Sequence, residues 1–358
     1  MYKKLFIPGP THVIDEILEA TAMPMVGHRD TLYSDLHGAV VPKLQKLLYT
    51  KQRIFLSTSS STGMMEGAIR NCVQSKALMT NCGAFSKRWV QIAQANGKAI
   101  EVITVDMGQA ITPEMVDEKL AQGGFDTVCI THNETSTGVM NPLKEIAEVV
   151  ARYPDVLLLV DAVSSMSGAE IRVDDWGLDV ALAGTQKCFA LPPGLCVVSV
   201  SQAAMDRSAE VENKGYYFDF YVLEKYARKN QTPATPIMSL INALNVQLDR
   251  ILQEGIENRF ARHTEMAAFV QGWARKHFAL YGDEKYLSQT VTNVHNVRGI
   301  SVANLNKELA TRGAMLSNGY GTLKETCFRI AHMGDLQMDD LVWLTGQIEQ
   351  VLGLGDGG

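Results

Sequence analysis

Strand-like and helix-like segments alternate along residues 53–184, and this alternation limits the possible folds more than any other feature of the chain. The strand-like segments lie at 53–59, 76–81, 99–106, 126–133, 155–163 and 179–184, and most intervals between them have helical periodicity. Several of the segments are apolar on both faces, as in VLLLV at 156–160, which is typical of a parallel sheet covered by helices. We therefore expect a doubly wound α/β domain.

The pattern changes after residue 235. Two long helical segments, 236–254 and 256–278, are separated by Gly255, and a strand around 299–305, a helix at 304–313, a strand at 326–332 and a helix at 339–353 follow. We expect a large domain over residues 1–250 and a smaller α+β domain over 251–358, with residues 1–22 packing on the smaller one.

Composition excludes several classes of function. The formal net charge is -6 and no long basic run occurs, so we expect no nucleic-acid partner. The apolar stretches are too short to span a membrane, and the N-terminal residues do not resemble a secretory signal, so we expect a cytoplasmic protein. The six cysteines and eight histidines lack the spacing of metal ligands, and we expect no metal site and reduced, buried thiols.

Polar residues follow three of the expected strands, where ligands of open parallel sheets bind. The Ser/Thr run at 57–62 could hold a phosphate at a helix N-terminus or only cap that helix. Asp161 could end a turn or face a pyridine nitrogen. Lys187, in LAGTQKCFALPPG (182–194), could be a solvated surface lysine or a desolvated Schiff-base lysine. Together the three features suit pyridoxal phosphate.

The chain resembles the class V (fold type I) pyridoxal-phosphate aminotransferases, and most closely the alanine–glyoxylate and serine–glyoxylate (serine–pyruvate) group. The similar motifs are PGPT (8–11), GHRD (27–30), STGMMEGA (61–68), THNETSTGVMNPL (131–143), LLLVDAVSS (157–165), GTQKCFALPPG (184–194), TPATPIMSL (232–240) and CFRIAHMG (327–334). The resemblance implies a large domain with a mainly parallel seven-stranded sheet covered by helices, plus a smaller α+β C-terminal domain.

The resemblance also assigns roles around the cofactor. Lys187 is identified as the Schiff-base lysine and proton carrier, and Asp161 as the partner of the pyridine nitrogen. The remaining cofactor-binding residues by resemblance are Ser60, Ser61, Thr62 and Gln186 at the phosphate, Phe85 stacked on the ring, Thr135 near the ring hydroxyl, and Thr232 and Thr235 reaching the phosphate of a neighbouring subunit. The last two imply a homodimer. The family often has glycines where Ser59 and Ser61 stand.

Arg329 and His28 are the expected substrate-binding residues. An arginine in an apolar strand needs either a buried acidic partner or a ligand carboxylate, and the resemblance favours the α-carboxylate of the substrate. His28 is placed at the pocket edge, and the neighbouring Arg29 could meet an acidic substrate or make an inter-subunit salt bridge.

The expected reaction moves an amino group from alanine or serine to glyoxylate or pyruvate by ping-pong kinetics. Aspartate, phosphoserine or aminoethylphosphonate are alternative substrates. A cysteine desulfurase is a further alternative, for which Cys327 is the one candidate nucleophile in the C-terminal half. A nicotinamide dehydrogenase lacks its glycine-rich fingerprint here, and a cofactor-free binding protein leaves Lys187 and Asp161 unexplained.

Overall fold

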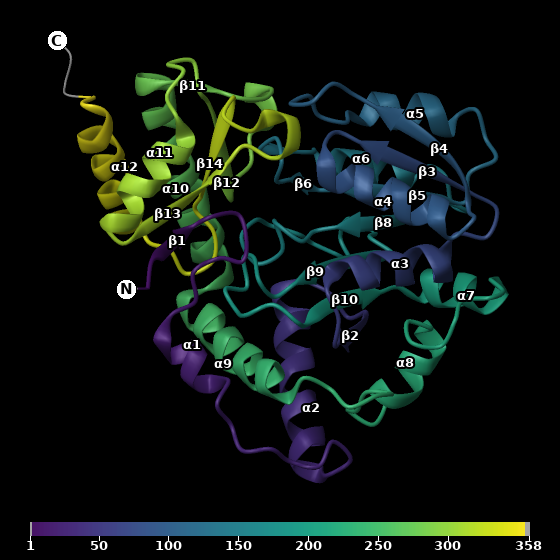
Figure 1. The fold of residues 1–358 in the computed structure, drawn as a ribbon. Coiled ribbons are helices and arrows are strands. Elements are labelled where there is room, and N and C mark those ends of the chain that lie inside the picture. The colour runs from purple at the N-terminus through teal and green to yellow at the C-terminus, as the bar shows by residue number, and fades with distance from the viewer. Residues whose placement is uncertain (1, 355–358) are drawn as a thin grey trace.

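The computed structural model describes residues 2–354, and a seven-stranded sheet forms its centre (Figure 1). The strand order is β2-β10-β9-β8-β5-β3-β4. The bounds are β2 Arg53–Ser57, β3 Lys76–Asn81, β4 Ala99–Thr104, β5 Thr127–Thr131, β8 Leu157–Asp161, β9 Val180–Gly184 and β10 Cys196–Val200. Only β10 runs against its two neighbours, so the predicted mainly parallel sheet of seven strands is confirmed.

Helices cover both faces of this sheet because its central strands are apolar on both sides. In β8, Leu158 and Val160 pack into one hydrophobic cluster, while Leu157 and Leu159 pack into the other. The first cluster includes residues of α2 (Thr31–Leu47), α5 (Pro113–Leu120), α6 (Leu143–Val150) and α9 (Met238–Glu254). The second includes residues of α3 (Ser61–Cys72), α4 (Ala84–Ala95), α7 (Gln202–Glu210) and α8 (Phe220–Ala227).

A second sheet of five strands lies beside the first, at the upper left of Figure 1. Its order is β1-β13-β14-β12-β11, with bounds β1 Lys4–Phe6, β11 Ala279–Leu280, β12 Val291–His295, β13 Ala314–Asn318 and β14 Cys327–Ala331. The helices α10 (Ile256–His277), α11 (Val302–Thr311) and α12 (Met338–Leu352) supply its hydrophobic core. The N-terminal strand β1 pairs in parallel with β13, which brings the start of the chain onto this sheet.

Short elements complete the structure. These are α1 (Asp15–Ala20), the hairpin β6 (Asn133–Glu134) and β7 (Val139–Met140), and the 3₁₀ turns Glu284–Tyr286 and Gly321–Leu323. None of the helices between residues 2 and 354 is long and apolar enough to cross a membrane.

The expected strand at 299–305 is wrong. The Ser301 hydroxyl accepts a hydrogen bond from the Asn304 N–H (3.2 Å) and caps α11, which begins at Val302. The apolar side chains of Val302, Leu305 and Leu309 then enter the core at helical spacing. The strand that pairs with β14 is β12, which lies earlier in the chain.

The boundary between residues 250 and 251 stays a prediction, as do domain limits that include residues 1 and 355–358, which lie outside the described range. The helix break at Gly255 is confirmed: α9 ends at Glu254, α10 begins at Ile256, and Gly255 has a φ of 90°. Such a φ favours glycine, because a Cβ would be strained there.

Candidate active site

A cavity of about 380 Å³ lies where the predicted strand-end residues come together. Eight of the predicted side chains line it: Ser60, Ser61, Thr62, Phe85, Thr135, Asp161, Gln186 and Lys187. They come from the ends of β2, β8 and β9, from the start of α4 and from the β6–β7 hairpin. A sheet edge thus gathers residues that are more than a hundred positions apart in the chain.

Lys187 stands on the turn after β9, and its amine reaches into the cavity. The Nζ atom lies 5.7 Å from the centre of the Phe85 ring and donates a hydrogen bond to the Pro8 carbonyl. Burial, and next the positive charge of Arg329, lower the pKa of Lys187 to about 8. An amine with such a pKa can lose and regain a proton near neutral pH.

Asp161 ends β8 and is nearly inaccessible to solvent. One carboxylate oxygen accepts the Val163 N–H (2.9 Å) and the other accepts the Thr131 hydroxyl (3.4 Å). Burial raises the pKa of Asp161 to about 7. A cationic group on the cavity side would favour the charged carboxylate, so the residue suits a protonated ring nitrogen.

Ser60, Ser61 and Thr62 form the N-terminus of α3, where backbone N–H groups are free to bind an anion. The Ser61 hydroxyl is buried and has no hydrogen-bond partner within residues 2–354. A Cβ added to Gly184 would lie 2.5 Å from both Ser61 Oγ and Gln186 Oε1, so the glycine lets these two side chains meet. This corner of the cavity offers hydroxyl, amide and backbone donors together.

Phe85 and Thr135 form another wall. Phe85 is in the first turn of α4, and its N–H and that of Ser86 donate to the buried carboxylate of Glu134 (3.1 and 2.9 Å to Oε2). The Thr135 hydroxyl lies 3.1 Å from the Ser164 hydroxyl. Glu134 therefore fixes the aromatic side chain through the helix N-terminus, a role that sequence reasoning missed.

Arg329 lies in β14, within hydrogen-bond distance of the lining residue Thr135, and is 8% exposed. Its guanidinium donates to the carbonyls of Thr135 (3.2 Å) and Asn318 (3.2 Å from both Nε and Nη2). Among residues 2–354 no carboxylate forms an ion pair with Arg329, and the charge of the buried Glu134 acts on it only from a distance. Burial lowers the pKa of Arg329 to about 10. Three of its five N–H groups are used, so two stay available to a ligand.

Four predicted residues are not among those that line this cavity: Arg329, which only bonds the backbone of the lining residue Thr135, and Thr232, Thr235 and His28. Thr232 and Thr235 line a small separate pocket that also contains Thr58 and Tyr217. His28 is half-buried in the segment before α2. Its neighbour Arg29 donates to the carbonyls of Thr232 (2.7 Å) and Pro233 (3.1 Å), so within one subunit that arginine braces the Thr232–Thr235 segment.

Other lining residues escaped the sequence analysis. Asn133 donates to Thr290 Oγ1 (2.7 Å), and its own Oδ1 is buried with no partner within residues 2–354. Arg88 lines the cavity next to Phe85, with no hydrogen bond or ion pair among the described residues. Gly9 lies so close to Lys187 that an added Cβ would be 2.6 Å from Nζ. The PGPT motif was the one available signal for this contact.

Comparison with known proteins places the chain in a family. The model of the family "Aminotransferase class-V" matches residues 38–336. The chain belongs to the class-V aminotransferases. This aminotransferase is 40% identical to an uncharacterized aminotransferase of Methanocaldococcus jannaschii, over 93% of this chain and 88% of that protein. It is 35% identical to the L-aspartate–glyoxylate aminotransferase of Paracoccus denitrificans, over 93% of this chain and 86% of that protein.

Solved structures agree with this assignment. The alanine–glyoxylate aminotransferase of Nostoc sp. superposes with a TM-score of 0.92 at 26% identity, covering 98% of this chain and 96% of that one. This protein is therefore a transaminase of fold type I, and its family implies pyridoxal phosphate as cofactor.

The residues bear on the cysteine desulfurase alternative and on metal binding. Cys327 is buried within β14, and burial raises the pKa of its thiol to about 12, so it is not a nucleophile on a loop. All six cysteines are buried and unpaired in the described structure. Within residues 2–354 no three His, Cys, Asp or Glu side chains form a group that could hold a metal ion.

Proposed function

We propose that this aminotransferase holds pyridoxal phosphate on Lys187 and transfers an amino group from alanine or serine to glyoxylate or pyruvate. The observation behind the proposal is the single cavity in which the Lys187 amine, the Asp161 carboxylate and the Ser60–Thr62 turn form three walls. Each wall offers one chemical group that the cofactor needs: an amine for its aldehyde, an acid for its ring nitrogen and donors for its phosphate.

The unsatisfied atoms of the cavity support the fit. The buried hydroxyl of Ser61 and the amide oxygen of Asn133 have no partners in residues 2–354, and buried polar atoms usually have one. Ser61 stands at the expected phosphate position with Gln186 beside it, and Asn133 faces the same cavity.

The cofactor, when bound, supplies an electron sink that stabilises negative charge at the substrate Cα. Lys187 would take the Cα proton and return it, since its pKa of about 8 lies near the working pH. Asp161 would keep the ring nitrogen protonated from its buried position. Phe85 would cover one face of the ring, and the two free N–H groups of Arg329 would donate to the substrate carboxylate.

Glyoxylate is the acceptor that best agrees with the relatives, because the names of the Paracoccus and Nostoc proteins both contain it. Aspartate is the second candidate donor. Arg88 supports it, since this cation lines the cavity without an ion pair in the described chain and could receive a second carboxylate.

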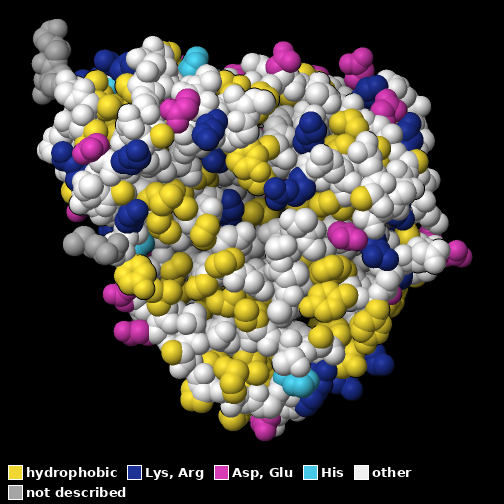
Figure 2. All heavy atoms as spheres, viewed as in Figure 1, with side chains coloured by type: hydrophobic (Ala, Val, Ile, Leu, Met, Phe, Trp, Pro, Cys, Tyr) yellow, Lys and Arg dark blue, Asp and Glu magenta, His cyan; other side chains and the backbone are white. Residues whose placement is uncertain are grey.

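We further propose a homodimer that completes the site. Thr232 and Thr235 line a pocket outside the cavity, together with the exposed side chains of Tyr216 and Tyr217. Figure 2 shows hydrophobic side chains gathered on the lower half of this face, where Figure 1 has α1, α2, α8 and α9. Met25 and Leu32, near the start of α2, are also exposed. Several exposed apolar side chains gathered on one face are typical of a subunit interface.

The proposal is tested on the purified protein with added pyridoxal phosphate. Borohydride reduction and peptide mapping should mark Lys187, and Lys187→Ala should lose transamination while keeping its fold. Adding alanine, serine, aspartate, phosphoserine or aminoethylphosphonate separately should convert the cofactor spectrum most rapidly with the true donor. Near-normal transamination by Lys187→Ala would refute the assignment.

A further inference from the structure

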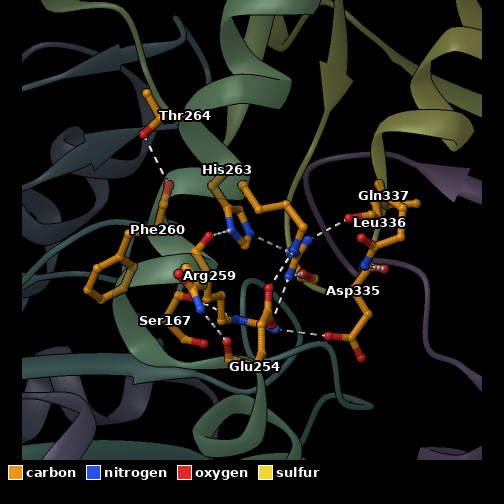
Figure 3. A network of polar contacts seen from close by, with 12 residues as sticks. Ser167, Glu254, Arg259, Phe260, His263, Thr264, Asp335, Leu336 and Gln337 are labelled. Carbon is orange, nitrogen blue, oxygen red and sulfur yellow. Dashed lines mark hydrogen bonds and ion pairs between the residues drawn. The ribbon is translucent and has the colours of Figure 1, made fainter.

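Arg259 is a fully buried arginine of α10 that bonds the backbone of the Lys187 turn. Figure 3 shows it in a polar network with Ser167 and Glu254. Its Nη2 donates to the carbonyl of Cys188 (2.8 Å), the residue directly after Lys187. Its Nε donates to the carbonyl of Ser167 (2.9 Å), in the segment that follows β8. One guanidinium thus bonds both the segment that follows β8, the strand of Asp161, and the turn that follows β9, which contains Lys187.

The third nitrogen of Arg259 faces the other sheet. Nη1 donates to Asp335 Oδ1 (3.1 Å) and to Glu254 Oε2 (3.0 Å). Asp335 lies in the segment after β14, the strand of Arg329, and the Gln247 amide donates to both of its oxygens (3.0 and 2.9 Å). The charge of the buried guanidinium is therefore balanced by two carboxylates, as a buried ion requires.

The same segment touches the Lys187 turn directly. A Cβ added to Gly334 would lie 2.9 Å from the Cβ of Ala190, and the Gly334 N–H donates to His263 Nε2 on α10 (3.1 Å). Ala190 has a φ of 55°, a left-handed conformation that is strained for a non-glycine residue. The turn has a backbone hydrogen bond of its own, from the Ala190 N–H to the Lys187 carbonyl (2.8 Å), and contacts from its surroundings help to hold the strained residue.

We propose that Arg259 is a positioning residue for transamination. It holds the backbone of Lys187 at a set distance from the strand of Arg329, so that the amine and the carboxylate-binding guanidinium meet one substrate in the correct geometry. The inference rests on the proposed roles of Lys187 and Arg329.

The test compares Arg259→Lys with Arg262→Lys in the cofactor-loaded enzyme. Lysine keeps the charge but cannot reach the two carbonyls and the two carboxylates at once. Arg262 is the matched control, because it donates to the same Glu254 carboxylate (2.6 Å) and to the carbonyls of Leu336 (2.6 Å) and Gly334 (3.2 Å). Within residues 2–354 it makes no hydrogen bond to the Lys187 turn itself. Both variants lose part of one buried network, but only Arg259→Lys loses hydrogen bonds to the Lys187 turn itself.

We expect kcat of Arg259→Lys to fall up to about a hundred-fold, the cost of a displacement of about 1 Å in a reacting group. The KM for the amino donor should change much less, because Arg329 keeps its own bonds. Arg262→Lys should keep kcat close to that of the wild type. An equal loss of kcat in both variants, or a lower melting temperature of Arg259→Lys with unchanged kcat, would overturn the proposal.

A second readout needs no cofactor. Acetic anhydride should acetylate Lys187 faster in cofactor-free Arg259→Lys than in cofactor-free wild type or Arg262→Lys, because a loosened turn exposes the amine. Equal rates in the three proteins contradict the proposal. If Arg259→Lys does not fold, Asp335→Asn takes its place. We expect this variant to lose less kcat than Arg259→Lys, and an unchanged kcat would contradict the proposal. Failure of the proposed function appears separately, as the absence of a borohydride-trapped adduct on Lys187 in the wild type.

Discussion

Replacing Lys187 by methionine should stabilise the cofactor-free protein near neutral pH. Burial holds the pKa of this amine at about 8 instead of 10.5. Below pH 8 the amine is charged in both the folded and the unfolded chain, and the folded state bears the full cost of desolvation. Above about pH 10.5 it is neutral in both states, and the cost disappears.

The size of the effect follows from this difference in pKa. A fall from 10.5 to about 8 lowers the free energy of unfolding by at most about 3 kcal/mol at pH 7. The value is an upper limit because the side chain lines a cavity and is only half-buried. The wild type should recover this stability as pH rises from 8 to 10.5, since its unfolded chain then binds more protons than the folded one.

Urea unfolding of cofactor-free wild type and Lys187→Met at several pH values between 7 and 10 measures the effect. The Met variant should be more stable at pH 7, and its advantage should shrink as pH rises. Lys87→Met is the matched control, since Lys87 is exposed on α4 and should give no pH-dependent gain. The reasoning is refuted if Lys187→Met is no more stable than the wild type at pH 7, or if its gain in free energy of unfolding is equally large at pH 10.

Three further predictions concern the other buried groups of the site. Arg329→Ala should lower kcat/KM for alanine by about a hundred-fold or more, because two charge-assisted hydrogen bonds of about 1.5–3 kcal/mol each are lost. The kcat/KM of Arg329→Lys should lie between those of the wild type and Arg329→Ala. A drop in the melting temperature of Arg329→Ala with unchanged kcat/KM would mean a structural role. Asp161→Asn should lower kcat by on the order of a hundred-fold, the cost of one preorganised charge, while the protein still binds the cofactor, as absorption titration checks. The Cys327 thiol, whose pKa burial raises to about 12, should stay unreactive towards a thiol reagent at pH 8 until urea unfolds the chain; rapid labelling of the native protein contradicts its burial.

Local patterns in the chain predicted six of the seven strands of the large sheet, and β10 (Cys196–Val200) was not predicted from them. The segment 76–81 was expected as a strand and is β3 with those limits. The strand before Asp161 was also recognised, since five apolar residues followed by a carboxylate fit a strand buried on both faces that ends at a sheet edge. Both signals depend on hydrophobic order within a few residues, which the chain contains without its fold.

The same local reasoning failed where a strand-like composition overlapped with a helix N-cap. Residues 299–305 contain β-branched and apolar side chains typical of a strand, yet Ser301 begins a helix there. The sheet register decided the outcome, because β12 already occupies the position beside β14. Pairing with a distant strand is a non-local interaction, and no short window of sequence contains it.

Only the tertiary structure determines which residues orient the side chains of the candidate site. Nothing in the sequence around Arg259 indicates that its guanidinium binds the carbonyl beside Lys187, or that Glu134 accepts the N–H groups of the helix that begins at Ala84. Which side chains supply a reactive amine or carboxylate can be read from residue type and strand ends, because chemistry belongs to single residues. Which distant group orients each of them depends on how helices and sheets pack, and only the folded chain brings those partners within hydrogen-bond distance.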